Sequence, residues 1–382
     1  MRHYLRQLDR SLLFYLAALL VFGTVMLYSA SSVQRQGGLE WGLHQLMRRF
    51  GQMGVGMLFL VLLAFLDRGW IRRLAPVAWG LSCVLLVLVL FTAGSRGTRG
   101  WLIGESLQPV EAARVATLVL MARLLAAREG LLGFWPRFRA PLIVLGLTVL
   151  VVVLQPDFGS ALALGLCGAL LLVAAGLPKR VIALGLLALI LVSAAGYQFS
   201  ARIRERVDWT YRVDPTELRE ETYQLGQSLI GMGAGGLTGA GPGGSRQKTF
   251  FLPDHHTDFI YSIVGEELGL IGTLAVMSLL LLLAWRMVRI GYASADPFAR
   301  YLAAGLGSMI FVYASLNMAV ATGLFPLTGL PLPFFSNGGS ALVMNMAAVG
   351  MVLGLSRDRR PAPRRSRREP SAYENPFREA GP

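Results

Sequence analysis

The densest group of polar side chains in this sequence lies between residues 245 and 258. It opens with Ser245-Arg246-Gln247-Lys248, continues with Phe250-Phe251-Leu252-Pro253 and closes with Asp254-His255-His256-Thr257-Asp258. Arginine and lysine bind phosphate oxygens, and an aspartate can take a proton from an attacking sugar hydroxyl. We therefore expect Arg246 and Lys248 to contact phosphate and Asp258 to act as a base, which suits a substrate that is both a sugar and a diphosphate.

Asp258 also has a structural interpretation. A long apolar run begins at Phe259, and the dipole of a helix starting there favours an acid at its N-terminus. Thr257 or Asp258 would then serve as the N-cap. Capping is thus the alternative to catalysis for this aspartate.

The adjacent histidines His255 and His256 have Asp254 and Asp258 on either side, which permits a metal site. Consecutive histidines seldom point at one ion, so hydrogen bonding within a loop is the alternative. A divalent cation, Mg²⁺ or Mn²⁺, is a candidate cofactor, and the sequence does not identify the metal. We place His256 among the residues that bind substrate.

Two further acids, Glu266 and Glu267, follow in the same apolar run. Along a helix Glu266 lies about 12 Å beyond Asp258 and about 80° around the axis, and Glu267 about 180° around, so at most one of them shares a face with Asp258. Acids this deep in an apolar helix face the protein interior, as catalytic groups or in a structural salt bridge. Gly265 and Gly269 form a small-x-x-x-small pair that predicts close packing of helices.

A second charged pair stands near the start of another apolar run. Glu111 and Arg114 have the i,i+3 spacing of a helical ion pair, which lowers the cost of burying both charges. Structural and functional roles are equally open for this pair. Trp101, in the polar segment before it, is either an interfacial aromatic residue or a platform on which a sugar stacks.

The third polar segment precedes the last apolar run. Gly329-Leu330-Pro331-Leu332-Pro333 leads to Ser336-Asn337-Gly338-Gly339-Ser340. Prolines interrupt a helix and glycines allow backbone amides to approach a ligand closely. Irregular backbone at membrane depth is tolerated only where it is buried or lines a water-filled cavity, so we expect a polar cavity that opens outward.

The composition indicates which environment surrounds these residues. Hydrophobic residues make up 54% of the 382, charged residues only 15%, and the mean hydropathy is +0.55. Soluble domains carry about 25% charged residues, so lipid surrounds most of this chain. The net charge of +14 is concentrated in short loops and the tail, which indicates a topological bias and not nucleic-acid binding. Cys83 and Cys167 lie in apolar runs and are expected to pack as small residues.

The apolar runs predict an all-α polytopic membrane protein. A hydrocarbon core about 30 Å thick requires about 20 apolar residues in a helix, and the fifth and sixth runs meet in a hairpin at Gln155-Pro156-Asp157. The ten predicted spans are Ser11–Ala30, Phe50–Leu66, Leu74–Thr92, Pro109–Ala126, Ala140–Leu154, Gly159–Gly176, Val181–Tyr197, Phe259–Trp285, Tyr301–Thr322 and Ser340–Leu355.

Arginine placement predicts the orientation. Arginines and lysines follow every even-numbered span and precede the first, which puts both termini in the cytoplasm. Arg48 and Arg49 contradict this scheme unless the second helix is longer than its apolar run. The first span has no clear cleavage site and is expected to be retained. We predict a membrane domain over residues 1–355, with a long external loop over 200–258, and a disordered basic tail over 356–382.

Motifs across nearly the whole chain resemble those of the SEDS family, the shape, elongation, division and sporulation proteins of the FtsW/RodA type. One of these motifs alone would be weak, but the ordered set is specific. They are Tyr28-Ser29-Ala30-Ser31-Ser32, Gln108-Pro109-Val110-Glu111, Gln155-Pro156-Asp157, Tyr223-Gln224 with Gln227-Ser228, Gly235-Gly236, Leu252 to Phe259, Gly265-Glu266-Glu267 and the glycine turn at Ser336.

The resemblance implies a ten-span glycosyltransferase of the bacterial cytoplasmic (inner) membrane that joins lipid II units into glycan strands. Its essential acid corresponds to Asp258, its aromatic residue to Trp101, and its membrane-embedded acid and base to Glu111 and Arg114. Implied partners are lipid II, a class B penicillin-binding protein and division or elongation factors. The predicted substrate-binding residues are Trp101, Gln108, Glu111, Arg114, Arg246, Lys248, His256, Ser336 and Gly338, and supporting roles are predicted for Asp157, Glu266 and Glu267.

The sequence departs from the family pattern at several positions. Val110 replaces a serine, Arg114 a lysine, Asn337 a tyrosine and Asp254 a glutamate, whereas Asp258 is unchanged. The segment 245–248 is similar to FtsW, the septal enzyme, and the segment 329–333 to RodA, the elongation enzyme. We favour the FtsW type. Two functions without polymerisation compete with it: a lipid II flippase, which needs the phosphate contacts but no base, and a scaffold that only recruits the penicillin-binding protein.

Overall fold

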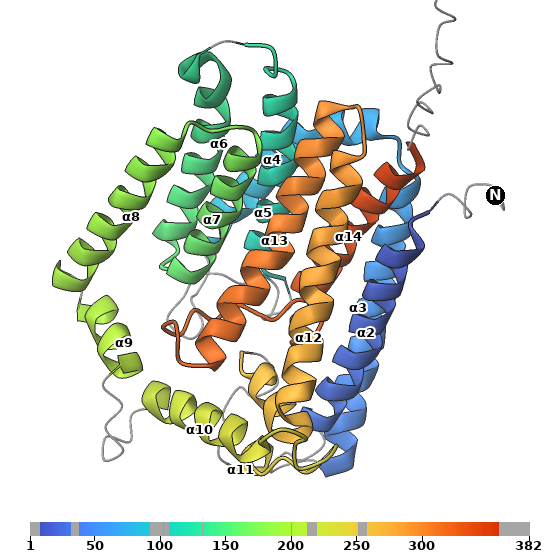
Figure 1. Ribbon diagram of the computed structural model, residues 1–382, viewed down its shortest axis with the longest axis vertical. Helices are drawn as coiled ribbons and strands as arrows, with labels where there is room; N and C mark the ends of the chain where they lie inside the picture. Colours follow the sequence, from blue (N-terminus) through green and yellow to red (C-terminus); the bar gives the residue numbers. More distant parts are fainter. Residues whose placement is uncertain are drawn as a thin grey trace, which may run out of the picture.

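The computed structural model describes residues 8–31, 38–91, 102, 107–131, 133–199, 201–211, 220–250 and 258–358. Within these ranges the chain is helical (Figure 1), and the only β pairing is an isolated bridge between Leu102 and Leu107. The helices are α2 (Arg10–Ser31), α3 (Gly38–Phe65), α4 (Arg68–Val89), α5 (Pro109–Ala126), α6 (Phe134–Leu154), α7 (Phe158–Ala174), α8 (Lys179–Phe199), α9 (Ala201–Tyr211), α10 (Glu220–Gly235), α11 (Gln247–Phe250), α12 (Ile260–Tyr292), α13 (Pro297–Ala321) and α14 (Gly339–Leu355), followed by a short 3₁₀ turn (Ser356–Asp358).

The predicted all-α fold is confirmed. Each of the ten apolar runs coincides with one helix, because a run of about 20 apolar residues satisfies its backbone polar groups internally only as a helix. In the described part of the chain, α2, α3, α4, α6, α12 and α13 are long and apolar enough to cross a membrane, and α7 and α14 are shorter apolar helices. The predicted tail lies almost entirely outside the described residues.

The external segment predicted as a loop over residues 200–258 is partly helical. It contains α9, α10 and the four-residue α11, which lie at the end of the bundle opposite to the start of α2 (Figure 1). Its high content of glycine and charge concealed these helices, because their stability comes from packing and not from an apolar run. Helix α10 packs against α12, and α9 contacts both α8 and α10.

Many of the arginines predicted to share one side do lie at one end of the bundle. Arg286 near the end of α12 forms a bidentate pair with Asp9 at the start of α2, at 2.7 and 2.9 Å. Arg300 at the start of α13 lies 2.9 Å from Glu129, which follows α5. Arg68 at the start of α4 lies 3.5 Å from Asp296. Helices α2 and α12 are therefore antiparallel, and α12 begins at the opposite end.

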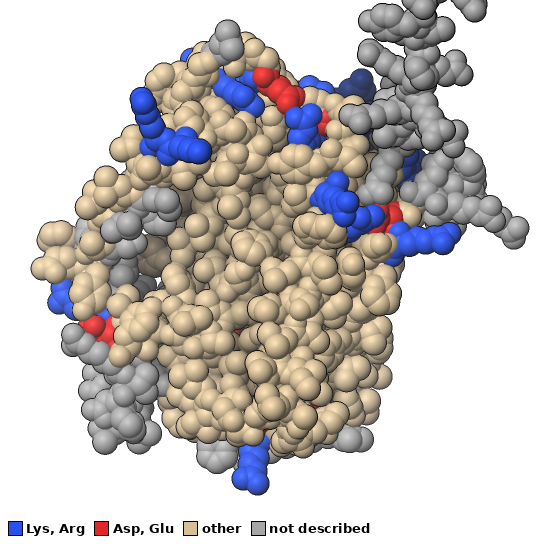
Figure 2. All heavy atoms as spheres, viewed as in Figure 1, with Lys and Arg blue, Asp and Glu red and all other residues tan. Residues whose placement is uncertain are grey.

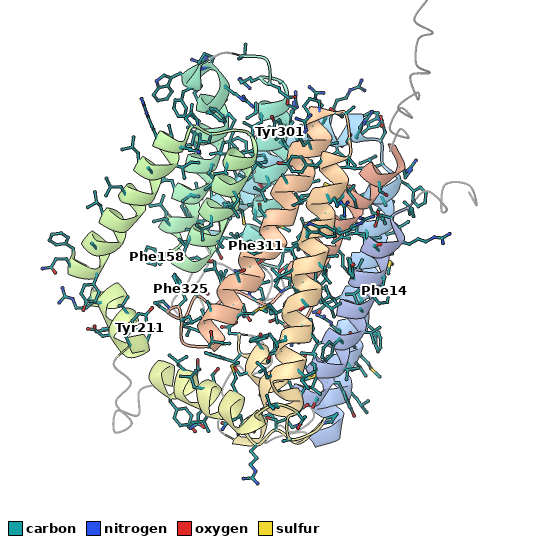
Figure 3. The ribbon with its side chains drawn as sticks, in the orientation of Figure 1. Phe14, Phe158, Tyr211, Tyr301, Phe311 and Phe325 are labelled. Atoms are coloured by element: carbon teal, nitrogen blue, oxygen red, sulfur yellow. The ribbon has the colours of Figure 1, made fainter. Side chains whose placement is uncertain are left out.

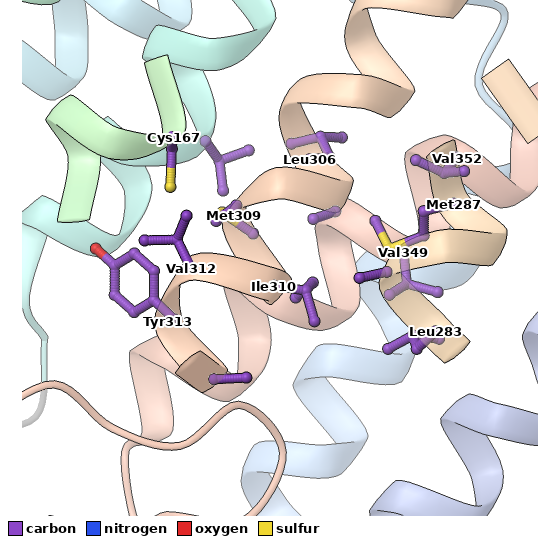
Figure 4. Packing of buried hydrophobic residues seen from close by; sticks show 14 of the residues in the cluster. Cys167, Leu283, Met287, Leu306, Met309, Ile310, Val312, Tyr313, Val349 and Val352 are labelled. Atoms are coloured by element: carbon purple, nitrogen blue, oxygen red, sulfur yellow. The ribbon is translucent and has the colours of Figure 1, made fainter. Parts of the chain in front are cut away.

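Helix α13 forms the centre of the bundle. It packs against α5, α7, α12 and α14, and most of its surface is buried. Figure 4 shows Leu306, Met309 and Ile310 of α13 with Met287 of α12 and Val349 of α14 on one side and Cys167 of α7 on the other. The elements around the site described below are therefore fixed to one apolar core.

The outer surface of the bundle is apolar. Helices α3 and α4 expose large hydrophobic side chains along their length, including Val55, Leu62, Val77 and Leu88. The central part of the face in Figure 2 carries almost no charged atoms, and Lys and Arg gather near its upper end. Continuous apolar surface of this extent is costly in water. It therefore faces lipid, and the chain is a multi-pass membrane protein.

Candidate functional site

Asp258 stands two residues before the start of α12 and does not cap it. The N-cap position is occupied by Phe259, with no side-chain hydrogen bond, so the capping alternative for Asp258 is wrong. The carboxylate of Asp258 points instead toward Gly329: a Cβ atom added to this glycine would lie 4.0 Å from Oδ2. The side chain is half-buried. It therefore faces the segment between α13 and α14, at the end of the bundle opposite to the cluster of arginines.

Asn317 of α13 holds this part of the chain together. Its Nδ2 donates to the carbonyl oxygen of Asp258 at 3.0 Å and to that of Leu330 at 2.8 Å. The side chain is almost fully buried, and an unsatisfied carbonyl there would be costly. One amide group thus fixes both the residue before α12 and the loop beside its carboxylate. Asn317 was not identified from the sequence, because it lies within an apolar run.

The segment from 323 to 338 between α13 and α14 is anchored by several other helices. A Cβ atom on Gly159 of α7 would lie 2.2 Å from the carbonyl oxygen of Thr328, and one on Gly23 of α2 would lie 2.3 Å from that of Phe334. Only glycine permits backbones to approach this closely. Gly329 has φ of +68° and Phe334 of +67°. The irregular backbone predicted from the glycines and prolines is present, and it is held rigidly against the bundle.

A buried arginine accounts for part of this rigidity. Helix α3 begins at Gly38, twelve residues before the predicted start, so Arg49 lies within it. Arg49 is fully buried and donates to the carbonyl oxygens of Phe334 and of Ser336, the latter at 3.1 Å. A buried charge needs such partners because it has lost its hydration. The arginines that contradicted the predicted topology therefore belong to a longer helix.

Ser336 and Gly338 lie in the turn that leads into α14. The hydroxyl of Ser336 accepts from the amide of Leu332 at 2.8 Å, and Gly338 takes the N-cap position of α14. The amide of Gln108, just before α5, donates to the hydroxyl of Ser340 at 3.4 Å. This bond joins the residue before α5 to the first turn of α14. Substrate binding by Gln108, Ser336 and Gly338 stays a prediction.

The predicted ion pair between Glu111 and Arg114 is confirmed. Nη2 of Arg114 lies 2.6 Å from Oε2 of Glu111, and both side chains are 2% exposed. The same nitrogen donates to Oδ1 of Asn345 at 2.7 Å, and the guanidinium carbon lies 4.1 Å from the centre of the Tyr313 ring. Figure 4 shows Tyr313 at the side of α13 that faces Cys167 of α7. A planar guanidinium can stack on a ring while its edge bonds an acid, which suits arginine in place of the family's lysine.

Asp157 has a structural role that the sequence alone did not specify. It is the N-cap of α7, and its carboxylate accepts from the amide of Ser160 at 3.0 Å. It also lies within electrostatic range of Glu111. Its cap fixes the start of α7, where Gly159 contacts the segment beside Asp258. The predicted supporting role of Asp157 is consistent with this position.

Lys248 is buried in an ion pair. Its Nζ lies 2.7 Å from Oε1 of Glu267, and the two side chains are 1% and 0% exposed. Ser29, near the end of α2, donates to the same carboxylate at 2.8 Å and accepts from Nζ at 3.2 Å. Phosphate binding by Lys248 would require this pair to open, so the expectation that it contacts phosphate has no support here. Of the two roles predicted for Glu267, catalysis or a structural salt bridge, the structure shows the salt bridge.

Arg246 is positioned through its backbone. Its amide donates to Oε1 of Glu266 at 2.8 Å, the hydroxyl of Ser245 donates to Oε2, and the side chain of Arg246 is exposed. Arg246 is thus the cation of the 245–248 segment that is accessible to a ligand. Its binding of phosphate stays a prediction.

Several predicted site residues lie outside the described residues. They are Trp101, Asp254, His255, His256 and Thr257. Among the described residues no group of three His, Cys, Asp or Glu side chains could hold a metal ion. The described residues therefore provide no protein ligand set for the divalent cation, and the metal stays a prediction.

Aromatic side chains lie along one side of this region. Figure 3 places Phe158 of α7, Phe325 after α13 and Tyr211 of α9 between the arm formed by α8 and α9 and the lower end of α13. The hydroxyl of Tyr211 donates to the carbonyl oxygen of Leu324 at 3.1 Å. The segment beside Asp258 is therefore flanked by apolar surface as well as by polar groups, a combination suited to an amphiphilic ligand.

Comparison with known proteins places this arrangement in a family. Residues 10–361 match the family FtsW/RodA/SpoVE, described as cell cycle protein. A probable peptidoglycan glycosyltransferase FtsW of Geobacter metallireducens is 38% identical over 91% of this chain and 94% of its own. The peptidoglycan glycosyltransferase MrdB of Escherichia coli is 32% identical over 92% and 94%. A chain in a solved peptidoglycan synthase complex that coordinates polymerization and crosslinking is 31% identical, with a TM-score of 0.77 over 93% of this chain and 99% of that one.

Proposed function

Because this chain belongs to the FtsW/RodA/SpoVE family of cell cycle proteins, we propose that it is a peptidoglycan glycosyltransferase that polymerises lipid II. The observation that carries the proposal is the carboxylate of Asp258. It is not used as a helix cap, and it faces the anchored segment at Gly329. It lies at the end of the bundle opposite to the arginine-rich end, where a base acting outside the cytoplasm is needed.

The proposed reaction is a single displacement. The carboxylate of Asp258 takes the proton of the acceptor sugar hydroxyl, and the hydroxyl oxygen forms a bond to the anomeric carbon of the donor. The bond from that carbon to the diphosphate oxygen breaks, and the polyprenyl diphosphate leaves with the electron pair. Inversion at the anomeric carbon converts an α-linked donor into a β-linked strand, and no covalent intermediate with the enzyme is required.

The leaving diphosphate gains negative charge, which a fixed cation would stabilise. Arg246 is our candidate, because its side chain is exposed while its backbone is fixed to Glu266. Lys248 contributes indirectly by neutralising Glu267. The aromatic and apolar residues beside the site, such as Phe158 and Phe325, suit the polyprenyl chain.

The decisive experiment is polymerisation of lipid II by the purified full-length protein, with the glycan products separated by gel electrophoresis. Asp258→Asn should fold and lose at least about 100-fold in rate, because the amide cannot accept the proton. Asp296→Asn is the matched control, since Asp296 caps α13 at the opposite end of the bundle. A folded Asp258→Asn protein with full activity would remove the base from the mechanism.

The same assay separates a polymerase from a flippase and from a scaffold. A lipid II flippase moves lipid II across vesicle membranes without producing glycan, and Asp258→Asn would not impair that movement. A scaffold would support growth of cells with either aspartate variant. Glycan made by the purified chain, and lost with Asp258→Asn, excludes both.

We propose a role in septal wall synthesis during division, in the bacterial cytoplasmic membrane. The segment 245–248 supports this assignment, as does the higher identity to an FtsW relative, 38%, than to MrdB, 32%. The likeness to a chain of a peptidoglycan synthase complex supports a crosslinking partner of the class B penicillin-binding type. Depletion of the chain should produce undivided filaments; rounded cells would indicate the elongation role instead.

A further inference from the structure

Helix α12 is interrupted at Gly269, which has φ of +65° and ψ of −161°. A regular helix would pair the amides of Leu270 and Ile271 with the carbonyl oxygens of Glu266 and Glu267. Those two bonds are absent in this structure, because all four groups bond to a different segment. The interruption lies three turns after Asp258, between the candidate base and the rest of the helix.

The segment from Gly236 to Gly241, directly after α10, replaces the missing turn. The amides of residues 240 and 241 donate to the carbonyl oxygens of residues 266 and 267 at 2.9 and 3.0 Å. In return, the amides of residues 270 and 271 donate to the carbonyl oxygens of residues 236 and 237 at 2.9 and 3.2 Å. Two helical hydrogen bonds are thus exchanged for four bonds to a neighbouring segment.

Glycines make this insertion sterically feasible. Gly239 has φ of +80°, and a Cβ atom added to it would lie 2.2 Å from the carbonyl oxygen of Glu267. A Cβ atom on Gly235 would lie 2.0 Å from the carbonyl oxygen of Gly265, and one on Gly269 would lie 2.5 Å from the amide nitrogen of Gly239. A side chain at any of these positions would force the two backbones apart.

Side chains tie residues 245–248 to the same turns of α12. The carboxylate of Glu266 accepts from the hydroxyl of Ser245 and from the amides of Arg246 and Gln247, the amides at 2.8 and 3.3 Å. Glu267 holds Lys248 in the buried ion pair. Residues 240–241 and 245–248 are therefore attached to the part of α12 that precedes Gly269, and residues 236–237 to the part that follows it.

We infer that residues 258–268 form one body with residues 240–248, that this body is joined to the remainder of α12 at Gly269 and through residues 236–237, and that it fixes Arg246 relative to Asp258. Gly239, Glu266 and Gly269 are then positioning residues for the reaction. They touch no substrate and act by setting where the base and the cation stand. The expected change in kcat rests on the proposed function. The joint itself rests on the four backbone hydrogen bonds between residues 236–241 and α12.

The test compares two glycines in the same segment of the full-length protein. Gly236 and Gly239 both have positive φ, at +53° and +80°, but a Cβ atom on Gly236 meets nothing within 4 Å. Gly236→Ala and Gly239→Ala therefore carry a similar backbone cost and differ in crowding against α12. Amide hydrogen exchange is measured in detergent, together with the kcat and KM of glycan polymerisation.

For Gly239→Ala we expect exchange at residues 240, 241, 270 and 271 to rise together and kcat to fall by about 100-fold, the cost of a small misplacement of reacting groups. Gly236→Ala carries only the backbone cost and should change both quantities much less than Gly239→Ala does. If Gly239→Ala does not fold, the four amides of the wild-type protein are expected to show one common protection factor, because a single opening exposes them all.

Independent exchange at residues 240 and 241 on one side and 270 and 271 on the other would overturn the inference, and so would equal effects of the two alanine variants. The two proposals are distinguishable. Joint exchange of the four amides in a wild-type protein that makes no glycan would refute the proposed function and leave the joint at Gly269 standing.

Discussion

Lys248 and Glu267 form an ion pair, with 2.7 Å between Nζ and Oε1, at 1% and 0% exposure. They lie 19 residues apart in the sequence, in α11 and in α12, and Ser29 of α2 completes the contact. Removing one partner of a buried pair leaves an uncompensated charge, which costs about 3–5 kcal/mol, whereas replacing both by apolar residues is often neutral. The pair thus attaches α11 to α12 as long as both charges are present.

This contact predicts a non-additive mutant cycle. Lys248→Met and Glu267→Leu should each lower the thermal unfolding temperature of the detergent-solubilised protein strongly, and the double variant should recover most of the loss. Arg300→Met at the partly exposed pair with Glu129, 31% exposed on both sides, is the control and should change stability by no more than about 1 kcal/mol. Additive losses in the double variant would show that the two charges act independently.

A second prediction concerns Arg49, which holds the turn before α14 by two carbonyl oxygens. Arg49→Lys offers one nitrogen in place of two and should destabilise the turn by about 2–3 kcal/mol. The rate of glycan polymerisation should fall with it, because the same segment faces Asp258. Stability is measured by thermal unfolding and activity by the lipid II assay.

The neighbouring Arg48 provides the control, since it is exposed on the same helix. Arg48→Lys should leave stability and activity unchanged. Equal losses for Arg48→Lys and Arg49→Lys would mean that the contacts of Arg49 with the turn are not the cause of the loss.

A third prediction follows from the position of Arg114 over the ring of Tyr313. Arg114→Lys keeps the charge opposite Glu111 but loses the planar stacking, and we expect a loss of about 1–2 kcal/mol. Tyr313→Leu should cost a similar amount, and the double variant no more than the larger single loss. Tyr313→Phe retains the ring face and serves as the control.

Thermal unfolding of the four variants checks this prediction. A stable Arg114→Lys protein, with Tyr313→Leu still destabilised, would assign the loss at Tyr313 to core packing alone. The family's usual lysine would then be interchangeable with arginine in this chain.

Local patterns predicted much of what the structure contains. The helices over the ten apolar runs follow from the thickness of a bilayer, although only six of the described helices are long and apolar enough to cross it. The pair of Glu111 with Arg114 follows from a helical spacing of three. The extension of α3 back to Gly38 was missed because Arg48 and Arg49 interrupt its apolar run. The partners of Arg49 are backbone carbonyls more than 280 residues away, and no local pattern indicates them.

The contacts around α12 were missed for a different reason. Gly265 and Gly269 correctly predicted close packing, but an uninterrupted helix was assumed in placing Glu266 and Glu267. The left-handed conformation at Gly269 depends on a segment 30 residues earlier that supplies the lost hydrogen bonds. The pair of Lys248 with Glu267 was not predicted, because these two residues become neighbours only in the folded chain. Lys248 was therefore expected to contact phosphate.

The last prediction concerns Asn317, whose Nδ2 bonds the carbonyl oxygens of Asp258 and Leu330. Asn317→Asp has nearly the same shape but no N–H groups, so both carbonyls lose their donor and a charge is placed beside them. We expect kcat to fall at least about tenfold, because Asp258 and the facing segment are no longer fixed together. Asn337→Asp, which among the described residues affects a contact with Gln45 at 3.0 Å, is the matched control and should keep most of the activity. Polymerisation kinetics and unfolding temperature are measured on the same preparations: a fall in kcat with retained stability supports positioning by Asn317, whereas unchanged kcat in a stable variant would show that Asp258 needs no such support.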